Sequence, residues 1–226
     1  MVVDGKSAGD RPLSDQVFQN TEIATASLVP EVRLRLLTDD SPLWQAFGEE
    51  PGADKLPRAY WAFAWSGGQA LARYVLDHAE VVRDRSVLDF GAGGGIASVA
   101  AAKCGARSVA ASEIDPVALA AVEVNAELNE VQVEGICDDL IYAENRGWDV
   151  VLAGDLWYNS RLARHGVAWL RRFARDGVLV LTGDPGRHFS LSAGLEELAS
   201  YQVRSIPDLE HPQVQTVRVC RLLPTG

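Results

Sequence analysis

Short β-branched runs alternate with alanine-rich stretches of helical periodicity through the second half of the chain. In order, these segments are SVLDF, IASVAAAK, SVAAS, PVALAAVEVNAEL, WDVVLA, LARHGVAWLRRFA and GVLVLT. Strands that are separated by helices usually lie parallel in one sheet, with the helices covering both faces. The alternation therefore predicts a doubly wound α/β fold.

A predicted helix precedes these alternating segments, and a predicted pair of strands follows them. The segment SGGQALARYVLDHA, which starts at Ser66, has apolar residues at helical spacing, and Ser66 with Gln69 fits a capping box. The strand candidates 201–206 and 215–222 are separated by a loop without a helix. We expect these two strands to pair antiparallel at one edge of the sheet.

The N-terminal part of the chain has a weaker pattern. Residues 1–20 look like a frayed terminus, residues 21–35 allow a short strand or arm, and residues 41–58 read as a surface loop with Trp44 and Phe47 as anchors. We therefore divide the chain into an arm and loop over residues 1–58, partly flexible, and one catalytic domain over residues 59–226. A length of 226 residues suits a single domain.

Composition excludes several classes of protein. Hydrophobic residues make up 47% and charged residues 23%, as in ordinary globular proteins. No apolar run is long enough to span a bilayer and the N-terminus is polar, so we expect a cytoplasmic protein without a membrane partner. A net charge of −10 argues against binding to nucleic acid. Cys104, Cys137 and Cys220 lie far apart, so we expect no metal site.

The strongest local signal is the glycine-rich segment VLDFGAGGG. A strand ends here at Asp89, and Gly91, Gly93 and Gly95 follow before the next helix. Glycines let a ligand approach the backbone closely at the positive end of a helix. A dinucleotide motif GxGxxG would need glycine at the position of Ile96, whereas GxGxG is satisfied. We predict a nucleotide-like ligand at this edge of the sheet.

Acidic residues follow the next two strands. Glu113 ends the second strand, where a carboxylate accepts hydrogen bonds from ribose hydroxyls. Asp115 precedes Pro116 and is better explained as the start of a helix. Asp138 and Asp139 follow the third strand, where an acid can accept a hydrogen bond from the adenine amino group. We prefer Asp139 for this role.

An acid and two aromatic residues follow the fourth strand. WDVVLA leads into Asp155, Trp157 and Tyr158, and such a cluster at the carboxyl edge is more often functional than structural. The fifth strand ends in GDPGR, where an ion pair between Asp184 and Arg187 within a tight turn is a competing explanation.

An aromatic run, YWAFAW, precedes the helix that starts at Ser66. We expect the segment from Trp65 to Gln69 to border the methionine end of the ligand. The other aromatic residues of the run are explained equally well by packing against one flank of the sheet.

These motifs together resemble one enzyme family. YWAFAWSGGQALARYVLD, VLDFGAGGGIASVAAAKCGA, EIDPVALAAVEVNAELN, GDLWYN and GDPGR, in this order, are similar to the lysine methyltransferases of the electron-transfer flavoprotein β subunit, whose bacterial members are also called predicted nicotinamide N-methylases. The chain departs from the family pattern at Ser66, usually proline, at Glu113, commonly aspartate, and at Trp157 in the aromatic slot.

The resemblance implies a fold, a cofactor and a reaction. The fold is a Rossmann-like class I methyltransferase, with a mostly parallel seven-stranded sheet in the order 3-2-1-4-5-7-6 and an antiparallel edge hairpin. The reaction is transfer of a methyl group from S-adenosylmethionine to the ε-amine of lysine in a protein, the electron-transfer flavoprotein β subunit. Our hypothesis is that Asp155 orients this amine against Trp157 and Tyr158.

Other functions stay open at this point. A nicotinamide-dinucleotide oxidoreductase shares the glycine turn and the acid, although Ile96 counts against it. A small acceptor such as nicotinamide would keep the same cofactor. A nucleic-acid base is disfavoured because the Asp/Asn-Pro-Pro-Tyr/Phe turn is absent after the fourth strand. A binding module without catalysis is the remaining alternative.

Overall fold

The computed structural model describes residues 13–37, 59–158, 160–186, 188–191, 193–204 and 214–225. The expectations for residues 1–12 and for the loop over residues 41–58, with Trp44 and Phe47, lie outside the described residues, as does Arg187. The division into an arm and a catalytic domain stays a prediction.

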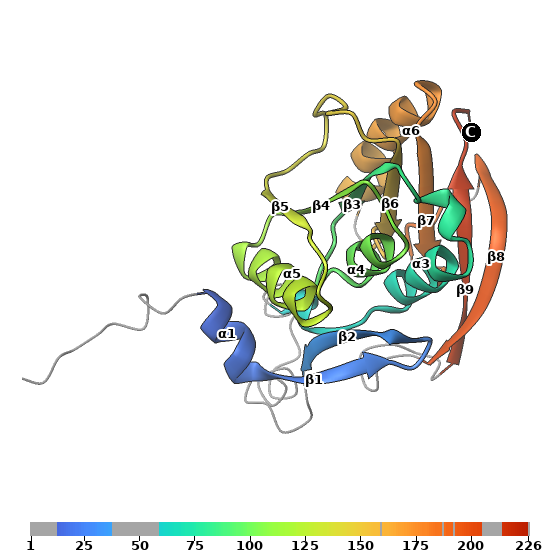
Figure 1. Ribbon diagram of the computed structural model, residues 1–226. Helices are drawn as coiled ribbons and strands as arrows, with labels where there is room; N and C mark the ends of the chain where they lie inside the picture. Colours follow the sequence, from blue (N-terminus) through green and yellow to red (C-terminus); the bar gives the residue numbers. More distant parts are fainter. Residues whose placement is uncertain are drawn as a thin grey trace, which may run out of the picture.

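A seven-stranded sheet forms the centre of the molecule, with the strand order β5-β4-β3-β6-β7-β9-β8 (Figure 1). Its strands are β3 Ser86–Phe90, β4 Ser108–Glu113, β5 Glu134–Cys137, β6 Val150–Gly154, β7 Leu179–Asp184, β8 Leu195–Arg204 and β9 Val214–Leu222. The first five strands in this order pair in parallel, and β9 pairs antiparallel with both β7 and β8. The doubly wound fold, the strand order and the antiparallel edge are confirmed.

Helices cover both faces of the sheet, as Figure 1 shows. The helices are α3 Ser66–Asp77, α4 Ile96–Lys103 and α5 Pro116–Leu128 on one face, and α6 Val167–Arg175 with the preceding π-helical turn η4 Leu162–Gly166 on the other. Val150 and Leu152 of β6 belong to the core under α3 and α4, whereas Val151 and Ala153 belong to the core under α6. Both faces of the central strands are therefore buried, as the apolar runs predict.

An N-terminal hairpin packs across the helices of the first face. Its strands are β1 Thr21–Ala26 and β2 Val29–Leu37, and the helix α1 Leu13–Asn20 precedes them. The prediction of a frayed terminus is therefore wrong for residues 13–20, which form a helix with Val17 buried. Val32 and Leu34 belong to the same core as α3 and α4. The Asn125 Oδ1 of α5 accepts a hydrogen bond from the Arg35 backbone N–H at 2.7 Å. The hairpin thus lies against the helices α4 and α5, which begin at the carboxyl edge of the sheet.

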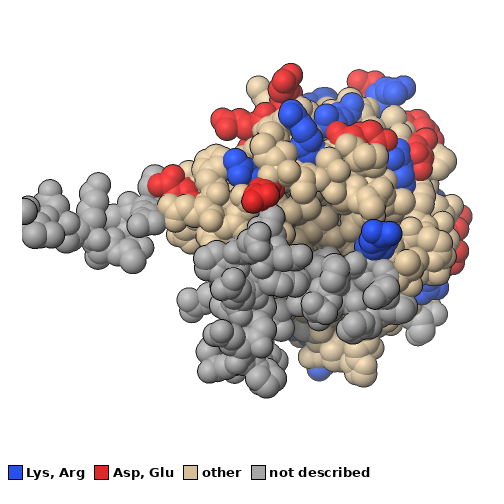
Figure 2. Space-filling model, turned by 90° about the horizontal axis from the view of Figure 1, so that it is seen from below, with Lys and Arg blue, Asp and Glu red and all other residues tan. Residues whose placement is uncertain are grey.

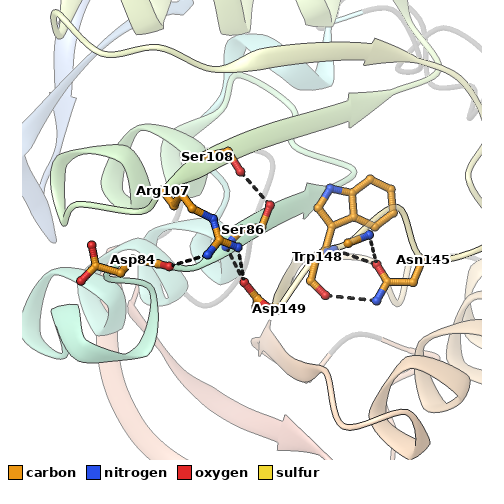
Figure 3. A network of polar contacts seen from close by, with 8 residues as sticks. Asp84, Ser86, Arg107, Ser108, Asn145, Trp148 and Asp149 are labelled. Carbon is orange, nitrogen blue, oxygen red and sulfur yellow. Dashed lines mark hydrogen bonds and ion pairs between the residues drawn. The ribbon is translucent and has the colours of Figure 1, made fainter.

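Polar side chains join the amino ends of three neighbouring strands (Figure 3). The Asp149 carboxylate accepts hydrogen bonds from the Ser86 N–H at 2.8 Å and from the Arg107 guanidinium at 2.9 Å, and the Ser86 and Ser108 hydroxyls are 2.7 Å apart. This network fixes the register at the edge opposite the glycine loop.

The start of α3 differs from the sequence prediction. Trp65 is the N-cap residue and its own side chain forms no capping hydrogen bond, so the capping box of Ser66 and Gln69 is wrong. The Ser66 hydroxyl accepts a hydrogen bond from the Gln215 amide at 2.9 Å, and the Gln69 amide donates to the Ala64 carbonyl at 2.6 Å. The start of α5 is as predicted, because Asp115 caps it by accepting from the Val117 N–H at 2.9 Å.

The short helices η2 Tyr60–Ala62 and η3 Ala79–Val81 flank α3. Among the described helices, none combines the length and the apolar character that crossing a membrane requires. The cytoplasmic location stays a prediction.

Candidate active site

The glycine loop between β3 and α4 has a backbone that side chains would disrupt. Gly91, Gly93 and Gly95 have φ angles of 68°, 55° and 79°, in the left-handed region. A Cβ atom on Gly91 would lie 2.7 Å from Leu156 Cδ2, and one on Gly94 would lie 2.6 Å from the Trp61 carbonyl oxygen. The loop therefore requires glycine both for its conformation and for the close approach of its neighbours.

Asp89 holds this loop from inside the protein. It is buried, and its Oδ2 accepts hydrogen bonds from the Ser98 N–H at 2.9 Å and the Ser98 hydroxyl at 2.6 Å. Burial raises the pKa of Asp89 to about 6, against the opposing effect of both Ser98 donors. Asp89 therefore ties the end of β3 to the first turn of α4.

Glu113 reaches the glycine loop from the end of β4. Its carboxylate accepts a hydrogen bond from the Gly93 N–H at 2.6 Å and another from the Ile114 N–H at 3.3 Å. Burial raises the pKa of Glu113 to about 7, the two N–H donors lower it, and the charges of Asp89 and Asp115 raise it further. The carboxyl group of Glu113 therefore contacts the glycine loop and changes its protonation state near neutral pH.

Asp155 lies where β6, β7 and α3 meet. Its φ angle is 54°, a strained value for a residue other than glycine, and its N–H donates to the Gly183 carbonyl at 3.0 Å. Its Oδ2 accepts from the Gly68 N–H at 3.0 Å. Asp155 therefore satisfies an N–H group in the first turn of α3, where the positive end of the helix favours a carboxylate.

A cavity at the carboxyl edge of the sheet brings many of these residues together. It is lined by Leu34, Leu36, Trp61, Phe63, Trp65, Gly68, Asp89, Gly91, Ala92, Gly93, Gly94, Ile96, Ala97, Asn125, Gly154 and Asp155. Five of the residues predicted from the sequence are in this set: Trp65, Asp89, Gly91, Gly93 and Asp155.

Sequence reasoning missed the contribution of the hairpin and of α5 to this cavity. Leu34 and Leu36 of β2 line it, and so does Asn125, whose amide donates to the Gly94 carbonyl at 2.8 Å. The periodic pattern of α5 could have indicated Asn125, because it is a polar residue on the buried face of that helix. The hairpin residues give no comparable signal.

Aromatic rings form one side of the site. The Trp65 ring centroid lies 5.5 Å from that of Tyr60 and 5.6 Å from that of Phe63, and the Trp65 indole N–H donates to the Tyr60 carbonyl at 2.8 Å. The Tyr158 ring lies 6.0 Å from Tyr60. The predicted residues Trp65 and Tyr158 thus belong to one aromatic cluster.

Trp157 and Tyr158, although adjacent, have different surroundings. Trp157 is 1% exposed and packs in the core under α6, so the structure does not bring its indole to the cavity. Tyr158 is 54% exposed. Its pKa is raised, first by burial and then by the charge of Glu113. Of these two aromatic residues, only Tyr158 is presented beside the carboxylates of the site.

Gln69 and Asp139 lie outside the cavity lining. Gln69 is buried, and its Oε1 has no hydrogen-bond partner among the described residues. Asp139 forms an ion pair with Arg161 at 2.5 Å and accepts from the Ile141 N–H at 3.1 Å, which together lower its pKa against the effect of burial. Arg161 was not singled out from the sequence.

The described charges on one face of the molecule do not form a patch of a single sign. Figure 2 shows that, on the face seen from below, acidic and basic side chains are interspersed along the rim of the described surface. No group of three or more His, Cys, Asp or Glu side chains in the described ranges could hold a metal ion.

Comparison with known proteins identifies the family. The family model of Ribosomal protein L11 methyltransferase (PrmA) matches residues 69–156. An electron transfer flavoprotein beta subunit lysine methyltransferase from Danio rerio is 41% identical over 83% of this chain and 74% of its own length. One from Xenopus laevis is 40% identical over 85% and 78%. The chain belongs to the electron transfer flavoprotein beta subunit lysine methyltransferase family.

Solved structures agree with the fold. A magnesium protoporphyrin IX methyltransferase from Synechocystis, crystallised with bound S-adenosylmethionine, is similar with a TM-score of 0.50 and 14% identity, over 68% of this chain and 77% of that one. Membership of the family makes this chain an S-adenosylmethionine-dependent methyltransferase that acts on lysine. The oxidoreductase and the small-molecule alternatives are not favoured.

Proposed function

We propose that this chain methylates lysine side chains of the electron transfer flavoprotein β subunit. The names of its relatives support this acceptor. The observation that carries the proposal is that β6 delivers Asp155 to the cavity lined by the glycine loop, with Tyr158 beside Glu113. Acceptor and cofactor groups would meet at one edge of the sheet.

The described residues fit S-adenosylmethionine. Gly93 lines the cavity, and a Cβ atom on it would meet nothing nearer than the Trp61 Cα at 4.0 Å, so a ligand can approach this part of the backbone. We assign Glu113 to the ribose hydroxyls, with Gly91, Gly93 and Gly95 beneath the ligand. We assign Trp65, which lines the cavity, to the methionine end of the ligand, and the buried Gln69 supports this end from behind through its hydrogen bond to the Ala64 carbonyl. Asp139 retains free lone pairs for the adenine amino group.

The enclosed cavity has a volume of about 50 Å3. Whole ligand pockets usually measure roughly 300–1,000 Å3. We therefore expect the cofactor to extend along the rim toward Glu113. Asp89 supports the loop through Ser98, since its carboxylate is directed into the first turn of α4.

When bound, S-adenosylmethionine supplies a methyl group whose carbon–sulfur bond breaks, with both electrons moving to sulfur, as the lysine nitrogen forms the new bond. The chain must present a neutral amine in line with that bond. Asp155 attracts the lysine ammonium, which then loses one proton to solvent. The neutral amine donates an N–H hydrogen bond to the Asp155 carboxylate, and this bond directs the nitrogen lone pair toward the methyl group. Positioning of this kind supplies roughly 7–11 kcal/mol of the barrier reduction.

The two aromatic residues contribute differently to this proposal. Tyr158 offers an exposed ring beside the carboxylates, whereas Trp157 acts through packing, because its indole is buried under α6. Trp157 is thus a positioning residue that holds the segment between Asp155 and Tyr158.

The test is intact mass spectrometry of the purified β subunit after incubation with this protein and S-adenosylmethionine, with nicotinamide assayed in parallel. We expect mass gains in steps of one methyl group on the β subunit, mapped to lysine. Methylated nicotinamide with an unmodified β subunit would overturn the proposal.

A further inference from the structure

Tyr60 is held at the edge of the active site by its buried neighbours. It begins the short helix η2, in which Trp61 is 3% exposed and Ala62 is fully buried, both in the core shared with α1 and α5. Tyr60 itself is 38% exposed. Its carbonyl is also bound by the Trp65 indole N–H at 2.8 Å. The backbone that carries the ring is therefore held in place by the fold.

Two further rings lie beside Tyr60. The Tyr60 and Trp65 rings are 5.5 Å apart with an interplanar angle of 52°, and the Tyr60 and Tyr158 rings are 6.0 Å apart at 33°. Tyr60 is thus the middle member of the three. These rings come from η2, from the start of α3 and from the end of β6.

The aromatic group adjoins the negative charges of the active site. Trp65 lines the same cavity as Asp155, and the charge of Glu113 acts on the Tyr158 hydroxyl. Aromatic faces attract alkylammonium ions, and negative charge nearby adds to the attraction. The combination suits a cation that carries apolar substituents.

We infer that Tyr60, with Trp65 and Tyr158, binds the ammonium group of the acceptor lysine and determines how many methyl groups that lysine receives. The inference rests on the proposed function and names a specificity-determining residue for it. Each transfer replaces an N–H donor by an apolar methyl group, so a carboxylate binds the product less well with each round. An aromatic face retains attraction for the methylated cation, and this favours continued methylation of the same side chain.

The experiment compares Tyr60→Phe and Tyr60→Leu with the wild type, and uses Tyr201→Leu on β8 as the matched control. Intact mass spectrometry of the β subunit gives the ratio of trimethylated to monomethylated lysine. We expect the wild type, Tyr60→Phe and Tyr201→Leu to proceed beyond one methyl group. For Tyr60→Leu the ratio should fall about 3- to 10-fold, as loss of one cation–π contact predicts.

A binding measurement separates this inference from the proposed function. Tryptophan fluorescence, with S-adenosylhomocysteine present, follows titration with N-acetyl-trimethyl-lysine methylamide and with its unmethylated form. We expect Tyr60→Leu to weaken binding of the trimethylated probe more than that of the unmethylated one, with unchanged thermal stability and unchanged affinity for S-adenosylhomocysteine. Equal probe affinities and equal product ratios in wild type and Tyr60→Leu would overturn the inference. An unmodified β subunit with a Tyr60-dependent probe affinity would overturn only the acceptor assignment.

Discussion

Replacing Gly67 by alanine tests how closely α3 must approach the ends of β6 and β7. The new Cβ atom would lie 2.5 Å from Asp155 Oδ2, and closer still to the Gly183 carbonyl oxygen. Neither neighbour can move freely, because Gly183 is part of β7 and Asp155 holds the Gly68 N–H. Overpacking of this kind costs about 1–3 kcal/mol.

Alanine also stabilises helices and restricts the unfolded chain, which offsets about 0.4–1 kcal/mol of that cost. We therefore expect the free energy of unfolding of Gly67→Ala to fall by about 1–2 kcal/mol. The corresponding decrease in Tm is about 2–8 °C for a chain of this size. Since Asp155 must shift, turnover should fall by roughly tenfold or more.

The assay is thermal unfolding by circular dichroism together with turnover on the β subunit. The control is Gly166→Ala, because Gly166 has φ −63° and ψ −45° and its Cβ would meet nothing nearer than Leu162 Cδ2 at 3.9 Å. This control should be stabilised by about 0.4–1 kcal/mol. If Gly67→Ala were stabilised to the same extent with full turnover, the reasoning about close approach would be refuted.

Two other predictions concern the buried carboxylates. The folded pKa of Glu113, about 7, lies above its ordinary value, so its contribution to stability is present at low pH and is lost as pH rises through 7. The affinity for S-adenosylhomocysteine should change with pH in the opposite direction, because the ionised Glu113 carboxylate accepts hydrogen bonds from both ribose hydroxyls. In calorimetry, this affinity should increase as pH rises through 7 in the wild type and should not depend on pH in this way in Glu113→Gln. A wild-type affinity independent of pH would contradict the ribose assignment. Ser98→Ala removes a hydrogen bond to Asp89 and should cost about 1.5–3 kcal/mol when Asp89 is ionised. Because the pKa of Asp89 is about 6, chemical denaturation should show a larger loss at high pH than at low pH, and equal losses would count against ionisation of Asp89.

The layered fold could be predicted because its signal is periodic. Alternating apolar strands and helices determine a parallel sheet, and Glu113 and Asp155 must then lie at its carboxyl edge. The edge order followed from the resemblance. Contacts between distant residues were not predictable in the same way: the first turn of α3 uses Asp155, 87 positions away, and not the local pair of Ser66 and Gln69.

The direction in which a side chain points was the other feature that could not be predicted from the sequence. The sequence DLWY does not indicate whether Trp157 or Tyr158 points into the core. The positive φ of Asp155 turns the chain, so that Leu156 and Trp157 are buried while Tyr158 is exposed. Likewise, the ion pair between Asp139 and Arg161 joins the loop after β5 to the helical segment after β6, and the proximity of these two segments depends on the order of β5, β4, β3 and β6.

Turnover of Asp155→Asn on the β subunit tests the central claim most directly. Asparagine can still accept the hydrogen bond from the Gly68 N–H, so this variant removes the charge and keeps the contact. The account predicts that methyl transfer falls by about 10²-fold or more, while binding of S-adenosylhomocysteine is retained. Wild-type turnover of Asp155→Asn, with an unchanged pH profile, would contradict the assignment of Asp155 to the acceptor lysine.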